Sequence, residues 1–375
     1  MKILSIRVPM GYKMLSKNFE INFMTKTRVN KDIPGDELLQ LENNFYYPIE
    51  TVFIGKNSSG KTSALELIDI AFEFLETGRI ENIFFVDKGL FEIEIVFYYR
   101  GLIYKYNGKF VKELGINKEY LIIKYETLRK TTMKDSYKKD LSNASFSNEK
   151  GFLPCINGDT SMVSRIIEDA GLNFFLDKED GNVALFGLLY DHLSKKTFDA
   201  LVHLFDDSVE FIEPYRENNE TNGFRFKRVG TNDAFLVNES YLESFLSDGT
   251  IRGINLYGLA IIAFKIGGTL IIDEIEKNFN RNLIENLLMM FEDKSINKCN
   301  ASIIYSTHYS ELLDINNRCD NVNVLHRDGT IITLKNMCTD YDFRTDMLKS
   351  GNFNQNAFDT LINYNRLMDL KENLR

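Results

Sequence analysis

Eight consecutive residues, Gly55–Thr62, have the types and the spacing that bind phosphate. They read GKNSSGKT and match the pattern G-x-x-x-x-G-K-[ST] in full. The two glycines let the backbone curl so that its N–H groups point at phosphate oxygens, while Lys61 reaches the β- and γ-phosphates and the Thr62 hydroxyl ligates Mg²⁺. The pattern therefore predicts that the chain binds ATP and Mg²⁺. The residues expected to contact the nucleotide are Gly55, Lys56, Asn57, Ser58, Ser59, Gly60, Lys61, Thr62 and Ser63.

Two acidic residues, Asp273 and Glu274, follow the apolar run Thr269–Ile272. A buried strand that ends in Asp would place this carboxylate beside the phosphate loop, where it can hold Mg²⁺ through water. Glu274 would then face the γ-phosphate and polarise the attacking water. The pair predicts ATP hydrolysis, with Glu274 and Lys61 as catalytic residues and with Thr62 and Asp273 at the metal.

Two shorter patterns lie near this acidic pair. The run LSDGT, residues 246–250, stands before a predicted helix, and its Ser247 hydroxyl and Gly249 amide are suited to an anion. A plain N-capping serine followed by a glycine turn would read the same way. His308 ends the strand-like run IIYSTH, where an imidazole could stabilise charge on a phosphate. His192, His203 and His326 have no such context, and we expect them to be structural or on the surface.

The elements that must position these groups can be predicted from periodicity. The apolar run Glu50–Ile54 leads into the phosphate loop, and Ser63–Phe74 has helical periodicity, which is the context that a phosphate loop requires. Further strands are expected at residues 3–8, 19–23, 209–212, 223–229, 269–272, 302–306, 321–325 and 330–334. Further helices are expected over most of 160–206, at 249–265, at 280–292, near 309–314 and in the tail 341–375.

Three other stretches complete the expected organisation. Residues 91–127 predict an antiparallel meander with tight turns at Arg100-Gly101 and Asn107-Gly108. Residues 30–47 predict a loop insertion, and the polar, locally basic residues 129–150 predict a surface loop. No internal repeat and no sustained heptad pattern is found, which argues against a long coiled-coil arm.

Composition bounds the class of protein. The chain has 375 residues, of which 44% are hydrophobic and 26% charged, as in soluble globular proteins. No apolar run is long enough for a transmembrane helix and no signal peptide is recognised, so we expect a cytoplasmic protein with no membrane partner. The net charge of −9 argues against a surface built wholly for DNA but leaves a local basic groove possible.

The cysteines do not indicate a metal site or a disulfide framework. None of them forms a C-x-x-C pair, and no histidine stands at metal-ligand spacing from them. We expect reduced, mostly structural thiols. The four are Cys155, Cys299, Cys319 and Cys338.

Taken in order, the phosphate loop, the antiparallel insertion, the helical lobe, Ser-x-Gly-Thr, IIDE and STH resemble an ABC-type ATPase head across nearly the whole chain. The S-x-G-T form and GGTLIIDEIEKNFN are similar to the OLD-like ATPases of bacterial anti-phage systems such as AbiL and PARIS, and Arg344-Thr345-Asp346 with Phe353 is a looser match. The resemblance implies an α/β fold: an ABC-type P-loop ATPase head with an antiparallel β insertion and a helical lobe.

The resemblance also implies roles for single residues. Ser247 and Gly249 of one protomer would contact the γ-phosphate bound by another protomer, in a head-to-tail nucleotide sandwich, and His308 would be the switch histidine that contacts the γ-phosphate. The implied segments are an N-terminal lobe with the phosphate loop and the β subdomain (1–127), a polar loop and helical lobe (128–245), a C-terminal lobe with the signature, the acidic pair and the switch histidine (246–340), and a helical tail (341–375).

The chain departs from this family in two places. Residues 309–375 are too few for the Toprim nuclease domain that some relatives carry, so any nuclease must be a separate chain. ABC ATPases also place a Gln between their lobes, whereas the glutamines here, Gln40 and Gln355, are not in the expected position. Glu126 is a candidate substitute.

These motifs are compatible with three functions. The leading one is an ATPase of anti-phage defence that forms a homodimer or higher oligomer around ATP and controls a separate effector, such as a Toprim nuclease. The second is a RecF-like repair or recombination ATPase that binds DNA, against which the acidic charge and the missing coiled coil weigh. The third is a nucleotide-gated scaffold that does not hydrolyse ATP. A transporter subunit is disfavoured because neither a membrane span nor LSGGQ is present.

Overall fold

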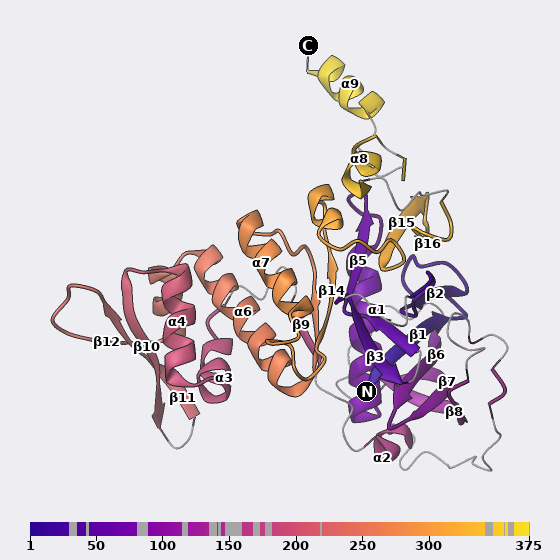
Figure 1. The fold of residues 1–375 in the computed structure, drawn as a ribbon, viewed down its shortest axis with the longest axis horizontal. Helices are drawn as coiled ribbons and strands as arrows, with labels where there is room; N and C mark the ends of the chain where they lie inside the picture. Colours follow the sequence, from indigo (N-terminus) through magenta and orange to yellow (C-terminus); the bar gives the residue numbers. More distant parts are fainter. Residues whose placement is uncertain are drawn as a thin grey trace. The chain divides into compact units, whose positions relative to one another are not determined.

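The computed structural model describes residues 1–29, 36–42, 45–80, 89–114, 119–134, 141, 144–146, 160–167, 173–176, 182–217, 220–341, 348–355, 357–358 and 364–374. The chain forms two compact units, Met1–Ala170 with Ser306–Arg375, and Gly171–Tyr305. Each unit contains both helices and strands (Figure 1). The predicted α/β class is therefore confirmed.

In the first unit, a buried strand runs directly into the phosphate loop and a long helix follows it. Strand β5 (Glu50–Gly55) is buried along its whole length, as expected of a central strand in a parallel sheet. Helix α1 (Lys61–Thr77) begins after Gly60 and ends at Gly78, which has φ 72° and donates its N–H to Phe74 O. Strand β15 (Val322–Asp328) pairs with β5 in parallel, and β16 (Ile331–Asn336) pairs antiparallel with β15. Strand β5, the phosphate loop and helix α1 thus follow one another in the order of a P-loop nucleotide-binding fold.

A five-stranded antiparallel sheet covers α1 with aromatic side chains. Its strands, in the order β2-β1-β6-β7-β8, are β2 (Phe19–Asn22), β1 (Lys2–Val8), β6 (Leu90–Tyr99), β7 (Leu102–Leu114) and β8 (Glu119–Thr132). The Phe74 ring of α1 lies 4.8 Å from the Tyr106 ring and 5.5 Å from the Phe110 ring, measured between centroids. The predicted meander is confirmed, and so is its first turn, because Arg100 and Gly101 both have positive φ as a type I′ turn requires.

Two predictions about this region were wrong. The sequence Asn107-Gly108 makes no turn, since β7 continues through it. A Cβ on Gly108 would lie 2.5 Å from Tyr106 Oη and 2.7 Å from Phe110, so the glycine makes room for two rings. The expected loop at 30–47 contains an antiparallel pair of strands instead, formed by β3 (Leu38–Glu42) and β4 (Phe45–Pro48), because Leu38, Leu39 and the aromatic residues of β4 are buried. Strand β8 also extends into the expected loop 129–150, most of which lies outside the described residues.

The tail of the first unit is helical where the structure describes it, as predicted. Beyond α2 (Val163–Ile166), the unit contains the 3-10 helix η3 (Ser310–Asp314), α8 (Lys349–Asn354) and α9 (Tyr364–Asn373). The Asp314 carboxylate accepts hydrogen bonds from the Lys349 and Ser350 N–H groups, and Lys349 Nζ donates to the carbonyls of Leu313 and Asn316. Burial lowers the pKa of Lys349. These bonds fix α8 to η3.

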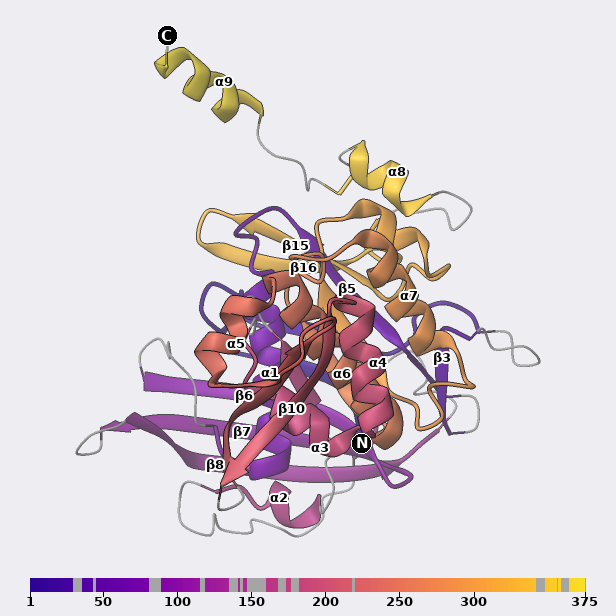
Figure 2. The ribbon, with the colours of Figure 1, turned by 90° about the vertical axis from the view of Figure 1, so that its left-hand side faces the viewer.

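The second unit combines three parallel strands with helices and a small antiparallel sheet. Strand β13 (Thr269–Ile272) pairs in parallel with β9 (Asn173–Leu176) and with β14 (Ser302–Ser306). Helices α3 (Leu185–His192) and α4 (Lys195–Phe205) pack against both helix α6 (Asp248–Ile266) and strand β10 (Val209–Glu217) (Figure 2). The small sheet contains β10 (Val209–Glu217), β11 (Glu220–Arg228) and β12 (Phe235–Val237), and the remaining helices are α5 (Glu239–Phe245) and α7 (Arg281–Glu292).

The helix predicted across residues 160–206 is wrong in its middle. Residues 173–176, NFFL, form β9, whose pairing with β13 runs from Asn173 opposite Thr269 to Leu176 opposite Ile272. Two adjacent phenylalanines favour a strand, and a four-residue run cannot reveal its period in the sequence. Strand pairing with residues almost a hundred positions later decided the outcome.

The two compact units meet at residues 170/171 and 305/306. The four segments with boundaries at 127/128, 245/246 and 340/341 stay a prediction. Among the helices that the structure describes, none has the length and apolar character to cross a bilayer.

Candidate active site

The phosphate loop between β5 and α1 has the backbone conformation that its glycines permit. Gly60 has φ 96° and Ser58 has φ 62°, so both lie in the left-handed region. A Cβ on Gly60 would lie 2.6 Å from Ile332 Cδ1, and a Cβ on Gly55 would lie 2.7 Å from Leu325 O. Both glycines are therefore required by close neighbours as well as by the turn.

Lys61 is buried at the start of α1, and its ammonium group folds back over the loop. Its Nζ donates to Gly55 O at 3.0 Å and to Lys56 O at 3.2 Å. Thr62 is exposed in the first turn of α1, where amide groups and the helix dipole favour an anion. The loop thus presents an ammonium group, a hydroxyl and a helix N-terminus together.

The hairpin of β15 and β16 supports this loop from behind, a contact that no local sequence signal revealed. Leu325 of β15 lies opposite Gly55, and Ile332 of β16 lies against Gly60. The Arg327 guanidinium donates to Ser58 O at 3.2 Å. The two strands were predicted, but their role in shaping the loop was not.

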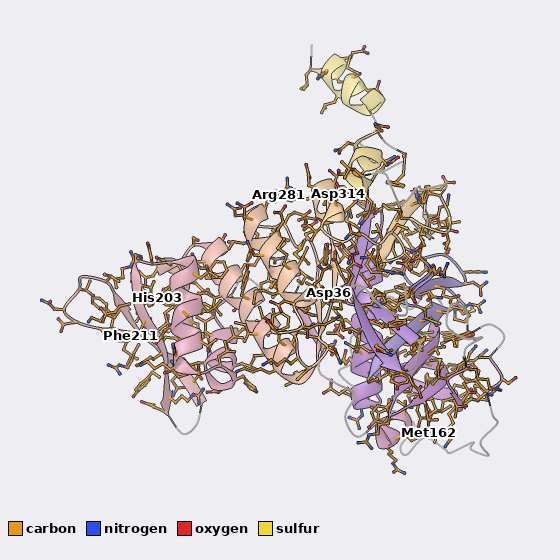
Figure 3. All side chains as sticks on the ribbon, viewed as in Figure 1. Asp36, Met162, His203, Phe211, Arg281 and Asp314 are labelled. Atoms are coloured by element: carbon orange, nitrogen blue, oxygen red, sulfur yellow. The ribbon has the colours of Figure 1, made fainter. Side chains whose placement is uncertain are left out.

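The segment that carries His308 lies beside β5. The Thr307 N–H donates to Phe53 O at 3.1 Å, and Thr307 Oγ1 accepts from the Tyr309 N–H at 3.0 Å. Phe53 stands two residues before Gly55, at the end of β5 that leads into the phosphate loop. His308, the residue after Thr307, therefore lies near this loop. The imidazole is half-buried. The other histidines contact protein groups: His192 and His203 contact carbonyls at exposed positions, and His326 contacts the Tyr341 hydroxyl. His203 is labelled in Figure 3.

In the second unit, Asp273 and Glu274 follow β13 as predicted. Asp273 is buried, and its N–H donates to Leu176 O at 2.9 Å. Glu274 is half-buried with φ 50°, a left-handed conformation that is uncommon for a residue other than glycine. Its carbonyl accepts the Lys277 N–H at 2.9 Å, which closes a turn. The backbone here is held in a costly conformation next to the predicted catalytic carboxylate.

Ser247 is the N-cap of α6. Its hydroxyl accepts from the Thr250 N–H at 3.1 Å and also contacts Thr250 Oγ1 at 2.9 Å. A Cβ on Gly249 would lie 3.0 Å from Asn278 O. The structure therefore contains the ordinary capping role of Ser247, and the phosphate-binding role stays a prediction.

Arg252, which the sequence reasoning did not single out, joins this helix to the acidic pair. It is 1% exposed, and its Nη2 donates to Asp273 O at 3.0 Å and to Glu274 O at 3.2 Å. The available signal was that Arg252 is the only basic residue of α6 before Lys265 in its last turn. A buried cation is rare unless it serves a defined set of acceptors.

Glu126, the suggested substitute for the missing Gln, has other partners. Its Oε2 accepts from Tyr106 Oη at 3.1 Å and from Ser161 Oγ at 2.5 Å, and its Oε1 accepts from the Met162 N–H at 3.3 Å. Three donors thus anchor this carboxylate between β8 and α2 (Met162 is labelled in Figure 3). The contacts indicate a structural role.

The predicted site residues therefore form two groups. The phosphate loop, Lys61, Thr62 and the His308 segment lie in the first unit, and Ser247, Gly249, Asp273 and Glu274 lie in the second.

One comparison with known proteins, the match to a family model, agrees with a nucleotide site. Residues 51–154 match the family model described as "AAA domain, putative AbiEii toxin, Type IV TA system", which spans less than half of the chain. No curated protein matches the sequence significantly. A similar solved structure is the SMC head domain from Thermotoga maritima, with 12% identity and a TM-score of 0.43, covering 90% of this chain and 99% of that one. The matched model and the complete phosphate loop identify a nucleotide-binding domain of the ATPase type.

Proposed function

We propose that this protein binds ATP–Mg²⁺ through Gly55–Thr62 and hydrolyses it with Glu274 as the residue that orients the attacking water. The observation that carries the proposal is the phosphate loop itself, with left-handed Gly60, buried Lys61 and exposed Thr62 at the start of α1. Oxygen ligands suit Mg²⁺, so the Thr62 hydroxyl and, through water, the Asp273 carboxylate would hold the ion. Lys61 would stabilise charge on the γ-phosphate, and His308 would contact the same group.

We further propose that the two groups of site residues complete one another around ATP in a dimer or higher oligomer. Ser247 and Gly249 stand at a helix N-terminus, which is suited to an anion. In this arrangement, the γ-phosphate bound by one protomer would meet the signature serine of another.

The biological role that we propose is control of a separate effector in anti-phage defence. The description of the matched family names the AbiEii toxin and a type IV TA system, which supports this proposal. The S-x-G-T form of the LSDGT run supports the same role.

A turnover measurement tests the catalytic proposal. Wild-type protein with ATP and Mg²⁺ should release phosphate, and Lys61→Ala and Glu274→Gln should each lower this rate by about 10²-fold or more. Lys61→Ala should also weaken ATP binding, whereas Glu274→Gln should still bind ATP. Wild-type turnover rates in Glu274→Gln would show that another residue activates the water.

A nucleotide-gated scaffold that does not hydrolyse ATP is the second candidate. It is favoured by the engagement of Glu126 with Ser161 and Tyr106, and by the positions of Gln40 in β3 and Gln355 at the end of α8. The same assay decides between the two, because the scaffold would bind ATP and release no phosphate.

A further inference from the structure

Helix α6 contacts the segment after β13 at three positions along its length. Gly249 lies against Asn278 O, Arg252 donates to the Asp273 and Glu274 carbonyls, and Tyr257 Oη donates to Leu283 O at 2.7 Å. The partners of these three residues all lie between Asp273 and Leu283. The helix that begins at the signature serine therefore runs along the segment that carries the proposed catalytic carboxylate.

Arg252 occupies the central of these positions, and two of its contacts are with main-chain atoms of the acidic pair. Its Nη2 reaches two consecutive carbonyls, Asp273 O at 3.0 Å and Glu274 O at 3.2 Å. It is among the largest fully buried side chains in the described part of the chain. Burying a guanidinium is costly, and charge-assisted bonds to carbonyl dipoles offset that cost only while both carbonyls stay in place. The position of these two peptide groups is thereby linked to the position of α6.

The peptide groups that Arg252 holds are those that aim the Glu274 side chain. Glu274 has φ 50°, and a residue with a Cβ leaves this conformation unless its surroundings enforce it. Two donors meet its carbonyl, the Arg252 guanidinium and the Lys277 N–H. Removal of the first would free the turn to adopt an ordinary backbone conformation, and the carboxylate would then point elsewhere.

We propose that Arg252 is a positioning residue for hydrolysis, which couples the signature turn Ser247–Thr250 to the direction of the Glu274 carboxylate. This inference rests on the proposed function. A phosphate bound by Ser247 and Gly249 would displace the N-terminus of α6. Arg252, five residues beyond Ser247, would transmit this displacement to the Asp273–Glu274 turn. The nucleotide held at the signature of a subunit thus influences the carboxylate of the same subunit.

The test compares Arg252→Met and Arg252→Lys with wild type by steady-state ATP hydrolysis, ATP binding and thermal unfolding. Arg252→Met should lower kcat by roughly 10- to 100-fold, because a misaimed catalytic group costs that much, and should change KM and ATP affinity less than twofold. Arg252→Lys keeps the charge and can reach one carbonyl, so it should restore part of kcat. If Arg252 had a merely structural role, its substitution would lower the melting temperature without lowering kcat at unchanged KM.

Arg228→Met is the matched control. Arg228 also donates to a main-chain carbonyl of the second unit, Phe245 O at 2.9 Å, but it is half-buried and its partner belongs to α5 rather than to the acidic pair. Its loss should leave kcat unchanged. If Arg252→Met does not fold, Arg252→Lys alone decides.

The outcomes separate this inference from the proposed function. Absence of turnover in wild type contradicts the proposed function itself. Wild-type turnover together with an unchanged kcat in a folded Arg252→Met or Arg252→Lys protein overturns the positioning role alone. Failure of both variants to fold would assign Arg252 to the core of the unit and would overturn it as well.

Discussion

Gly60 shows at the scale of one residue how the loop depends on the absence of a side chain. Its φ of 96° is costly for any residue with a Cβ, by about 1–2 kcal/mol. In Gly60→Ala, the new methyl group would also meet Ile332, which is buried in β16. We expect this variant to bind ATP at least about tenfold more weakly, because Ile332 and the loop must both move. Isothermal titration with a non-hydrolysable ATP analogue measures the change.

Gly101→Ala is the control for this prediction. Gly101 has φ 78° in the same unit, but nothing lies within 4 Å of the position of its Cβ. This variant should lose a similar backbone free energy and keep its affinity for ATP. Equal ATP affinity in both variants would show that Ile332 does not constrain the phosphate loop.

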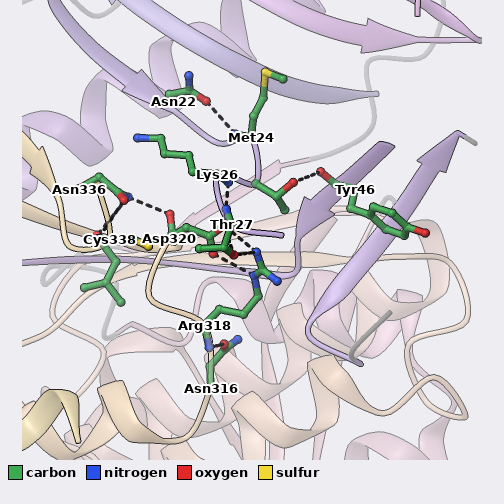
Figure 4. A network of polar contacts seen from close by, with 12 residues as sticks. Asn22, Met24, Lys26, Thr27, Tyr46, Asn316, Arg318, Asp320, Asn336 and Cys338 are labelled. Atoms are coloured by element: carbon green, nitrogen blue, oxygen red, sulfur yellow. Dashed lines mark hydrogen bonds and ion pairs between the residues drawn. The ribbon is translucent and has the colours of Figure 1, made fainter. Parts of the chain in front are cut away.

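Asp320 acts at the scale of elements, because it ties the segment after β2 to the turn before β15. Its Oδ2 accepts from the N–H groups of Lys26 at 2.7 Å and Thr27 at 2.9 Å, and its Oδ1 accepts from Arg318 Nε at 2.9 Å (Figure 4). Burial alone would raise the pKa of Asp320, but Arg318 and the two backbone amides outweigh burial and hold this pKa below its ordinary value. The ionised carboxylate is therefore the form that stabilises the fold.

Asp320→Asn should lower the free energy of unfolding by about 3 kcal/mol near neutral pH, since it leaves Arg318 without its buried partner. A carboxylate with a lowered pKa contributes its full stability above the unfolded pKa, near 4, and loses it as the pH falls through the lower folded pKa. The difference between wild type and variant should thus shrink below about pH 4. Urea unfolding at several pH values measures it. Asp293 is exposed, and hydrogen bonds from Ser295 lower its pKa. Asp293→Asn should therefore differ much less from wild type in its free energy of unfolding.

Much of the element order could be predicted because its signals are local. Complete burial of β5, β13 and β14 follows from short apolar runs, and α6 begins at a capping serine and ends at a glycine with φ 77°. Pairing between distant segments has no such local signal. Strand β9 was missed for this reason, because its partner β13 lies almost a hundred positions later. The pairing of β3 with β4 and the passage of β7 through Gly108 are local, but they depend on burial of side chains and on the packing of two rings over Gly108.

The residues of the candidate site show the same difference between local signals and contacts across the sequence. The phosphate loop could be predicted because spacing within one turn defines its chemistry. Arg252 could not, because its acceptors lie twenty-one and twenty-two residues further along the chain and are main-chain atoms that any sequence provides. The contact of Arg327 with Ser58 is hidden in the same way, because the partners are 269 positions apart in the sequence.

At the scale of the whole molecule, the proposed sandwich requires that ATP join two chains. The test uses a Glu274→Gln background, in which ATP should bind and persist. Adding ATP–Mg²⁺ should shift the protein from its mass of 43.5 kDa to at least twice that mass in size-exclusion chromatography with light scattering. Adding Ser247→Ala should abolish the shift while ATP still binds, because the signature hydroxyl of the other protomer is lost.

Ser194→Ala provides the matched control for that experiment. Ser194 caps α4 as Ser247 caps α6, since its hydroxyl accepts from the Thr197 N–H at 3.2 Å and contacts Thr197 Oγ1 at 2.7 Å. Each serine variant should lose about 1 kcal/mol of stability with its cap. The Ser194 variant should nevertheless associate with ATP as the parent does, because α4 has no signature role. Association of the Ser247 variant to the same extent would reduce Ser247 to its capping role and remove the basis for a nucleotide sandwich.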